Sequence, residues 1–429
     1  MLFKSMIIFG SSLLLLNSSL HAESLSPSGE GKLATSSVDL RTAVRKTFEY
    51  NPALRTFNYE LKAQRGRELQ AGLSASPEVS LQLEEGFGTG EFSGTDNAKL
   101  TLGVAWVLEG DLRQSHIDVA RAGTASLSTE DKIKHLDAAA ETAQLYMNSL
   151  ANQARLDAAI KTVSLAKATV REVKKRVASG RAPKAELARA QADLAYSKLT
   201  EEDVEHELDS SIRVLAAQWG ETQPSFSTVR GDVFRLPILL PFAELKSLFN
   251  NSPEYIRLVS NKRLREAELK LAKSKGQAAW KVNLGVRHIE TTNDQALVAG
   301  ISLPFGERSR NTGGIIEAQE NLLQTQAQAE GVRIRFETTL YVLFQELQHS
   351  QHQVESYRNE IIPKLELALT ETRRAYQLGR YSYLEWRSVQ ADLLEARRVL
   401  VEASITVHLK IIEIERLTGV SAVQPEGKS

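Results

Sequence analysis

Two kinds of hydrophobic pattern alternate along the chain, and both recur in its second half. Apolar and polar residues alternate one by one at 78–87 and 98–108, and again at about 280–289 and 296–305, which predicts four strands. A short polar or glycine-rich loop separates the members of each pair. Period-two alternation over about ten residues is typical of a strand that crosses a bilayer in a barrel, and equally of a half-buried soluble hairpin. The pattern alone leaves both open.

Long helices are predicted between these hairpins. Residues 110–179 contain no proline, and 308–378 contain only Pro363. In the second stretch apolar residues recur at spacings of three and four and slip in phase at the proline, which is typical of a coiled-coil seam with one stutter. Shorter helices are predicted at 184–219 and 382–417.

Each half also opens with a helical pattern that a proline interrupts, Pro52 in the first half and Pro253 in the second. A proline at such a position kinks or breaks a helix. In each half, the two short helices together match the long helix in length. The economical packing therefore stacks them end to end beside it, with the strand hairpin at one end.

A repeated stretch marks the other end of each half. "GRAPKAELARAQADL" begins at Gly180 and "GRYSYLEWRSVQADL" begins at Gly379, with no gap between the copies when they are aligned. Such a repeat indicates duplication. We therefore predict a first structural repeat at 37–223, a linker at 224–240, a second repeat at 241–420 and a tail at 421–429, with both copies at the far tip of a helical hairpin.

The N-terminal segment and the composition indicate export. Residues 1–22 have the charged start, apolar run and small residue of a signal peptide, and a polar segment follows at 23–36. The chain has no cysteine, which excludes disulfides, cysteine-ligated zinc, thiol nucleophiles and a lipid anchor through cysteine. Its 53 basic and 53 acidic residues are interspersed, without a basic block that would bind nucleic acid.

Four strands with apolar faces leave two unpaired sheet edges, and cyclic assembly of identical chains removes both. An exported chain with a membrane barrel and long helices is then interpreted as a conduit across a periplasm.

Four stretches of the chain carry a family resemblance: "YNPALRTFNYELKAQ", "GLSASPEVSLQLEEG", "GISLPFGERSRNTGGIIEAQ" and "YQLGRYSYLEWRSVQADLLEAR". In them, and over nearly all of its mature length, the chain resembles the TolC-like outer-membrane efflux proteins. Within this family it is most similar to the subgroup for cobalt-zinc-cadmium-type heavy-metal efflux.

The resemblance implies a fold that is mainly α with membrane β. This is a homotrimer whose twelve-stranded β-barrel, four strands per chain, continues into a long α-helical coiled-coil barrel. It implies a passive duct in the outer membrane, with the helices in the periplasm. A resistance-nodulation-division-type inner-membrane transporter and a periplasmic membrane-fusion adaptor would supply the cargo, here heavy-metal cations.

The resemblance also assigns gate residues at the second tip. Glu385 matches an acidic position that lines the periplasmic constriction, and Tyr376 matches an aromatic that latches the closed state. The second acidic position falls on Ser388, so one ring of carboxylates is missing. Three Glu385 side chains around a narrow axis would repel one another and select cations. A plain helix-start glutamate is the alternative, and Glu186 is assigned to that class.

Two further sets of residues are predicted to have roles. The turns that would dock the adaptor are Gly180, Arg181, Ala182, Gly379, Arg380 and Tyr381. The aromatic girdle at the membrane surface would comprise Phe87, Phe92, Trp106 and Phe305.

Other candidate sites are weaker. His349 and His352 lie three apart on a helix without a third ligand nearby, so solvated histidines are favoured over a metal site. His288 falls in a strand, and "GERSRNTGG" lacks the strand-to-helix setting of a phosphate loop. No catalytic set stands out, so we expect neither an enzyme nor a cofactor. The alternatives are a drug-efflux or type I secretion channel and, less favoured, a coiled-coil structural or adhesion protein.

Overall fold

The computed structural model describes residues 37–277, 279–304 and 311–423, and these belong to one compact unit. The predicted signal peptide (1–22), the polar segment (23–36) and Phe305 lie outside the described residues.

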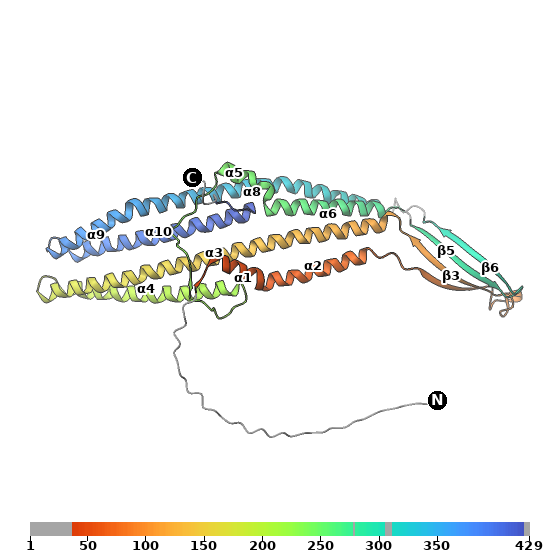
Figure 1. Ribbon diagram of the computed structural model, residues 1–429, viewed down its shortest axis with the longest axis horizontal. Coiled ribbons are helices and arrows are strands. Elements are labelled where there is room, and N and C mark those ends of the chain that lie inside the picture. The colour runs from red at the N-terminus through yellow and green to blue at the C-terminus, as the bar shows by residue number, and fades with distance from the viewer. Residues whose placement is uncertain (1–36, 278, 305–310, 424–429) are drawn as a thin grey trace, which may run out of the picture. The chain divides into compact units, whose positions relative to one another are not determined.

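The described chain runs twice through the same order of elements (Figure 1). The first half contains β1 (Ser37–Val38), α1 (Leu40–Tyr50), α2 (Pro52–Ala71), β2 (Glu78–Glu84), the short helix η1 (Gly90–Phe92), β3 (Lys99–Leu108), α3 (Asp111–Ala178) and α4 (Lys184–Ala217). The second half contains β4 (Thr228–Val229), α5 (Phe242–Ser247), the short helix η2 (Leu248–Asn251), α6 (Pro253–Lys275), β5 (Trp280–Ile289), β6 (Asp294–Ser302), α8 (Thr312–Ser356), the π-turn η3 (Tyr357–Ile361), α9 (Ile362–Gln377) and α10 (Tyr383–Thr418).

The predicted proline breaks are helix starts. Asn51 caps α2, since its side chain accepts hydrogen bonds from the amides of Ala53 and Leu54, and Pro52 occupies the first turn, where no amide donor is needed. Ser252 caps α6 in the same way ahead of Pro253. Each half therefore opens with separate shorter helices in place of one kinked helix: α1 and α2 in the first half, and α5, η2 and α6 in the second.

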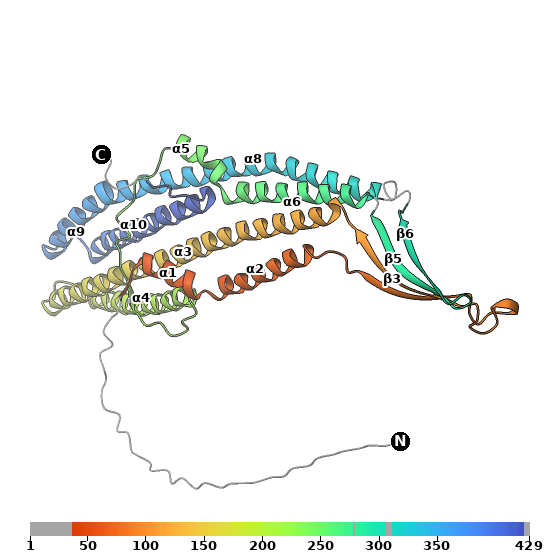
Figure 2. The ribbon, with the colours of Figure 1, turned by 45° about the vertical axis from the view of Figure 1, so that its right-hand side comes forward.

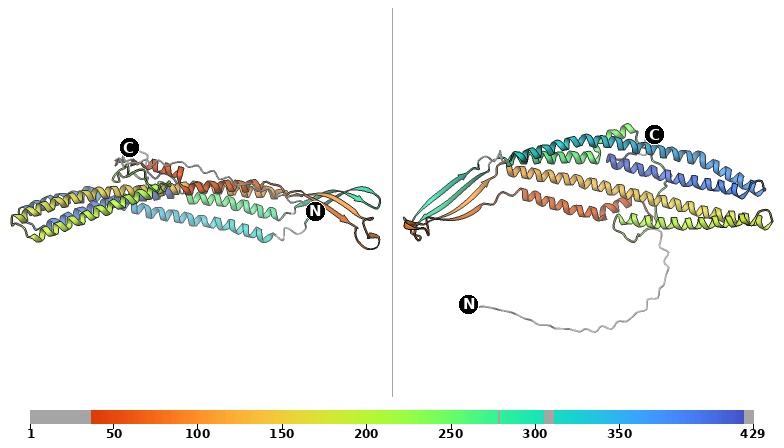
Figure 3. Two further views of the ribbon diagram at one scale, coloured as in Figure 1. Left: turned by 90° about the horizontal axis from the view of Figure 1, so that it is seen from below. Right: turned by 180° about the vertical axis from the view of Figure 1, so that it is seen from behind.

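Helix α3 is the longest element, with 68 residues, and it packs against α4, α2 and α1 of its own half. It also contacts α6 and α10, which joins the two halves, while α8 packs against α6 and α10. The strands lie at the end of the helices opposite the α3–α4 and α9–α10 turns (Figures 1 and 2), as the views from below and behind also show (Figure 3). Within the described residues, no helix combines the length and the apolar character that crossing a membrane requires.

The four long strands form one antiparallel sheet in the order β2-β3-β5-β6. The hairpins of the two halves therefore meet at the centre, where β3 pairs with β5 and Gly103 lies opposite Gly285. No other described strand pairs with the outer edges of β2 and β6.

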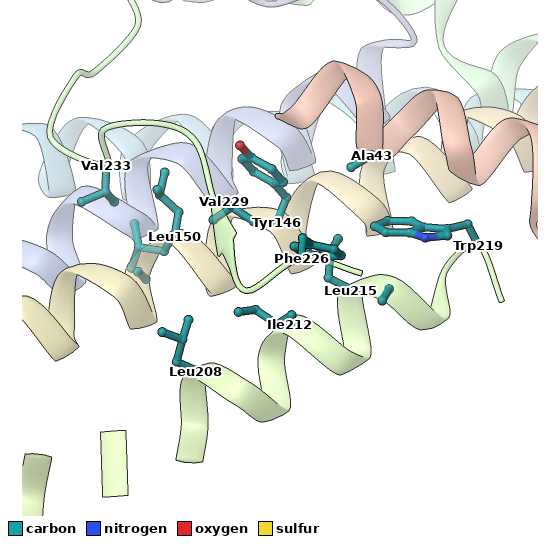
Figure 4. Close-up of a cluster of buried hydrophobic side chains, with 13 residues drawn as sticks. Ala43, Tyr146, Leu150, Leu208, Ile212, Leu215, Trp219, Phe226, Val229 and Val233 are labelled. Carbon is teal, nitrogen blue, oxygen red and sulfur yellow. The ribbon is translucent and has the colours of Figure 1, made fainter. Parts of the chain in front are cut away.

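The main core of the first half lies beside the middle of α3. Tyr146 and Leu150 of α3 pack against Leu215 of α4, Ala43 of α1 and Val229 of β4 (Figure 4). A second cluster joins α5, α8 and α10. Burial of these side chains, at roughly 25 cal/mol per Å² of apolar surface, holds each half together.

A strap, residues 228–241, crosses both halves at this level. Its first residues pair in parallel with β1, and Leu239 forms a bridge with Val423 near the other end of the described chain. Side chains from the long helices hold its backbone. Gln153 of α3 donates to the carbonyl of Val229 at 2.9 Å, and Arg358 of the π-turn donates to that of Phe234 at 2.7 Å.

His408 of α10 holds the strap through its uncharged form. Its Nε2 lies 3.0 Å from the carbonyl oxygen of Val233, and since a carbonyl only accepts, this nitrogen carries the proton. Burial lowers the pKa of His408 below its usual value, although the hydrogen bond to Val233 and the nearby Asp232 act in the opposite direction. The folded state therefore resists a second proton that the unfolded state accepts.

We expect acidification to remove the stability that His408 contributes. A histidine with a depressed folded pKa contributes fully above its ordinary pKa of about 6.5 and loses that contribution as the pH falls below it. His408→Gln keeps a donor for Val233, so its thermal midpoint should fall less between about pH 7.5 and about pH 5.5 than that of the wild type. His349→Gln, at an exposed position on α8, is the control. Equal losses in all three proteins would contradict the assignment.

Candidate functional site at the helix tips

Both tips are built by the same helix-ending motif. Gly180 and Gly379 have φ angles of 69° and 75°, in the left-handed region that favours glycine. In the first tip the amide of the residue after the glycine bonds to the carbonyl of Arg176, at 2.9 Å, and in the second to that of Ala375, at the same distance. This six-to-one bond is the Schellman motif. The repeated Gly-Arg pair is therefore a repeated helix stop.

Arg176 ties the two tips together. From the last turns of α3 it donates to the main-chain carbonyls of Tyr376 and Gln377 at the end of α9, and to that of Arg181 in its own tip. Its guanidinium carbon also lies 4.5 Å from the centre of the Tyr376 ring. A cation at the C-terminal end of α9 is favourable because the helix dipole is negative there.

An aromatic cluster fills the space between the tips. Tyr376 of α9 packs on Trp386 of α10 with ring centres 5.1 Å apart, and Tyr383 lies 6.3 Å from the same tryptophan. All three are almost completely buried, with Val173 of α3 and Ala190 of α4 beside them. The aromatic residues come from the second half and pack against helices of the first.

The two tyrosines donate to carboxylates of α4. The Tyr376 hydroxyl lies 2.9 Å from Glu186, and the Tyr383 hydroxyl lies 3.0 Å from Asp193. Arg387 adds a two-pronged bond to Asp193, with nitrogen–oxygen distances of 2.7 and 3.0 Å. Burial, followed by the neighbouring carboxylate, raises the pKa of each tyrosine, so both remain protonated donors.

Glu385 lies in the first turn of α10, exposed to solvent. It forms a capping box with Ser382, whose amide donates to the Glu385 carboxylate at 2.7 Å. Hydrogen bonds from the backbone and then the side chain of Ser382 lower the pKa of Glu385, which is therefore ionised. Ser388 is exposed one turn further along the same helix.

The structure thus brings some predicted residues together and keeps others apart. Tyr376 contacts Glu186, which the sequence analysis classed as an ordinary helix-start residue, and makes no hydrogen bond to Glu385. Sequence reasoning missed the group of Arg176, Tyr383, Trp386, Asp193 and Arg387. The signal was a difference between the repeats, because the second copy has Tyr383, Trp386 and Arg387 where the first has lysine, leucine and alanine. The predicted docking residues all lie in the two turns or directly beside them: Gly180, Arg181, Ala182, Gly379, Arg380 and Tyr381.

At the opposite end, the sheet has one apolar and one polar face. Leu100, Leu102 and Trp106 alternate with Thr101 and small residues along β3. The exposed apolar side chains of the other strands include Val79, Leu81, Leu83, Trp280, Leu284, Val286, Leu297 and Ile301. A strand of this length, with one apolar face, fits the membrane band of a barrel.

On the other face, charge pairs cross β3. Arg287 of β5 lies 2.7 Å from Glu84 of β2 and donates to Thr101 between them. Lys281 reaches Glu78 at 2.6 Å in the same way. Acidic side chains of β2 are thus matched by basic side chains of β5 across small residues of β3.

The three described residues that were predicted to form an aromatic girdle lie at both ends of the strands. Trp106 is near the helical end of β3, and Trp280, which the prediction did not include, begins β5 diagonally opposite it, on the same face by the pairing of Trp106 with Val282. Phe87 follows β2 and Phe92 lies in η1, within the loop at the other end. The period-two pattern that placed Trp106 outward could also have placed Trp280.

The structure does not group the three histidines that were the weaker candidates for a metal site. His349 and His352 are exposed on α8, and His288 lies 3.2 Å from Glu290 at the end of β5. Across the part of the chain that the structure describes, no three histidine, aspartate or glutamate side chains are grouped to hold a metal ion.

Comparisons with known proteins agree with this geometry. Residues 43–221 match the family model described as outer membrane efflux protein. The cobalt-zinc-cadmium resistance protein CzcC of Cupriavidus metallidurans is 23% identical over 347 residues, which are 81% of this chain and 80% of CzcC.

Solved structures match the fold over more of the chain. CusC, which forms a transmembrane channel, has a TM-score of 0.74 at 15% identity and covers 93% of this chain and 96% of its own. The outer membrane protein VceC of Vibrio cholerae has a TM-score of 0.73 at 17% identity, covering 89% and 96%. Both structures have the TolC-like fold. Residues 43–221 are thus similar to the outer membrane efflux proteins, and the chain as a whole has the fold of the TolC-like channels.

Proposed function

We propose that this protein is the outer membrane duct of a tripartite efflux system that exports heavy-metal cations. In this proposal three copies close a twelve-stranded barrel in the outer membrane, and their helices form a tube in the periplasm. An inner-membrane transporter delivers cargo through a periplasmic adaptor that docks on the tips. The observation that carries the proposal is the four-stranded sheet, which has one exposed apolar face and two edges that no other described strand pairs with. Such a sheet buries its edges when copies assemble in a ring.

The oligomeric state and location provide the first test. The mature protein, extracted in mild detergent from separated membranes, should have the mass of a trimer and come from the outer membrane. In planar bilayers it should conduct ions. A monomer or dimer in the soluble periplasmic fraction would overturn the duct.

The metal cargo is supported by the similarity to CzcC, whose name assigns it to cobalt, zinc and cadmium resistance. Cells with and without the protein should differ in growth on graded zinc, cobalt and cadmium salts. A matched series with hydrophobic drugs and with a secreted polypeptide tests the alternative cargoes. If cells with and without the protein tolerate all the metals equally but differ in drug tolerance, the metal cargo is wrong and drug efflux replaces it.

We also propose that the Glu385 carboxylates of the three copies line a gate at the periplasmic end of the tube, which predicts a change in ion preference for Glu385→Gln. Glutamine can replace glutamate in a capping box, so the substitution removes the charge while keeping the start of α10. Loss of the ring of carboxylates should reduce cation preference, and Ser388→Glu, which adds a ring, should increase it.

The measurement is the reversal potential of single channels under a salt gradient. Glu371→Gln on α9, also exposed and near the tip, is the control. If Glu385→Gln and Glu371→Gln give the same reversal potential as the wild type, Glu385 is a helix cap and no more.

A further inference from the structure

Although the formal net charge of the chain is zero, the first tip has a strongly basic surface. Six exposed basic residues surround the α3–α4 turn, and none of them forms an ion pair with any described residue. This basic surface consists of Arg171, Lys174 and Lys175 of α3, Arg181 of the turn, and Lys184 and Arg189 of α4.

The acidic residues in the same stretch do not neutralise this surface, because they face the second tip. Glu172 accepts a hydrogen bond from Gln377 at 3.2 Å and lies 3.9 Å from Arg373 of α9. Glu186 accepts the bond from Tyr376. The exposed basic residues therefore repel one another without a compensating partner among the residues that the structure describes, which costs folding free energy and attracts an acidic molecule.

The second tip adds apolar side chains beside this surface. Leu378, Tyr381 and Leu384 are 62%, 48% and 56% exposed around the α9–α10 turn. The corresponding positions of the first tip carry serine, alanine and alanine. Apolar anchors next to a charged rim are the usual composition of a protein-binding surface.

The two tips present these features as one preformed surface. Arg176 bonds to carbonyls of both turns, and the buried aromatic cluster lies directly behind them. A partner that binds here does not have to order the turns first, so more of the contact free energy is retained as affinity.

We propose that the tips dock a protein whose helical-hairpin end is acidic. Its carboxylates would contact the basic surface of the first tip, and its apolar side chains would contact Leu378, Tyr381 and Leu384 of the second. This inference rests on the proposed function, and it gives the adaptor a chemistry that the tips can recognise. Exposed charges then steer the encounter, while the apolar contacts hold the complex.

The depth of the basic surface favours a protein over an anionic membrane. From Arg171 to the end of α3 at Ala178 the helix rises about 10 Å, at about 1.5 Å per residue. A flat lipid surface touching the turn would leave Arg171 beyond the Debye length of about 8 Å at physiological salt. A helical hairpin lying along the tip could reach these residues.

Binding to defined helical hairpins tests the proposal. Three disulfide-closed hairpins identical except for a glutamate, glutamine or lysine tip are titrated against the purified full-length protein in detergent. We expect the glutamate hairpin to bind about 10- to 100-fold more tightly than the glutamine one, since several exposed ion pairs act together. The difference should nearly disappear when salt is raised from about 0.1 M to about 1 M, because the charges are then screened.

Substitutions connect this preference to the basic surface. Lys174→Glu, Lys175→Glu and Arg181→Glu combined should reverse the preference, and the same three positions changed to glutamine should abolish it without new charge. The matched control is the combination of Arg65→Glu, Arg213→Glu and Arg263→Glu, at exposed positions on α2, α4 and α6 without ion pairs to described residues. It should keep the wild-type preference.

Two outcomes would overturn the docking inference. One is equal binding of the glutamate and glutamine hairpins. The other is tight binding to phosphatidylglycerol vesicles, lost in the glutamine variant, without any preference among hairpins; the basic surface would then be a lipid contact. Conductance of the wild-type protein in planar bilayers shows whether the docking inference or the proposed duct has failed. A protein that conducts without hairpin preference overturns the inference alone, and one that prefers the glutamate hairpin without conducting overturns the duct.

Discussion

Asp193→Ala should raise the conductance of the protein in planar bilayers at least tenfold. Asp193 accepts bonds from the Tyr383 hydroxyl and from two nitrogens of Arg387, so its loss leaves a buried hydroxyl and a cation without their acceptor. Hydrogen bonds to a charged group contribute about 1.5–3 kcal/mol each. Because Arg387 is half exposed, its share is small and we count about 2 kcal/mol in total. We propose that these contacts favour a closed duct over an open one, so their loss shifts that equilibrium toward the open duct more than tenfold.

The duplication provides a control for this substitution. Asp392 occupies the same place in the second copy of the repeat, is exposed, and has no ion-pair partner among the described residues. Asp392→Ala should conduct like the wild type. Adding Glu186→Ala to Asp193→Ala, which also removes the acceptor of Tyr376, should increase the conductance further. If Asp193→Ala and Asp392→Ala behave alike, these bonds do not hold the tips closed.

Gly285→Ala should cost about 3 kcal/mol or more of unfolding free energy. A Cβ at this position would lie 2.7 Å from the main-chain oxygen of Leu102 and 3.1 Å from the Cα of Gly103, in the strand paired with it. No side-chain rotation relieves a contact with backbone, so β3 and β5 must separate at the centre of the sheet. Overpacking of well-packed interiors costs about 1–3 kcal/mol and occasionally more, and here it also weakens ladder hydrogen bonds.

Gly66→Ala is the matched control, since it adds the same methyl group in α2 and, apart from the chain neighbours and the backbone of the helix itself, no atom lies within 4 Å of the new Cβ. It should stabilise the protein by about 0.5–1 kcal/mol, because alanine loses less conformational entropy in a helix than glycine does. Urea titration of both variants in detergent, followed by tryptophan fluorescence, measures the difference. Equal midpoints would show that the central glycines are not required for close strand approach.

Periodicity predicted the larger elements of this fold because the signals are local. Helices α3 and α10 begin and end within two residues of the predicted bounds, 110–179 and 382–417. Strand β2 ends at Glu84, against 87 in the prediction. The alternation of apolar and polar residues breaks at Glu85, where glutamate stands at a position due for an apolar residue, and the backbone turns to positive φ at the same residue.

The phase slip in the second long helix was predicted at Pro363, and the structure has a π-turn just before it, at Tyr357–Ile361. Proline lacks an amide donor, and its ring crowds the carbonyl four residues earlier, so a wider turn on that side relieves the contact. Arg358 within the turn also bonds to the strap. That contact joins residues more than a hundred positions apart, and no local pattern carries it.

The contacts at the tips could not be predicted from the sequence either, because they too join residues that are far apart in the chain. Glu186 and Glu385 occupy equivalent places in the repeat, and local chemistry makes each an ordinary residue for a helix start. Only the packing of the second hairpin against the first gives Glu186 a tyrosine donor and leaves Glu385 with its own cap. Duplicated sequence thus has unequal surroundings, and the large residues present in one copy alone were the best available indication.

The strand order β2-β3-β5-β6 has a consequence for how such chains can diverge. Because every neighbouring pair is antiparallel, the two outer edges run in opposite directions, and copies placed side by side meet as an antiparallel pair. Loss or gain of a single strand would give both edges the same direction and change the ladder at every junction between copies. Gain or loss of a whole hairpin, which has two strands, keeps the two outer edges running in opposite directions. Evolution of the width of such a sheet is therefore expected to proceed by hairpins, in even steps.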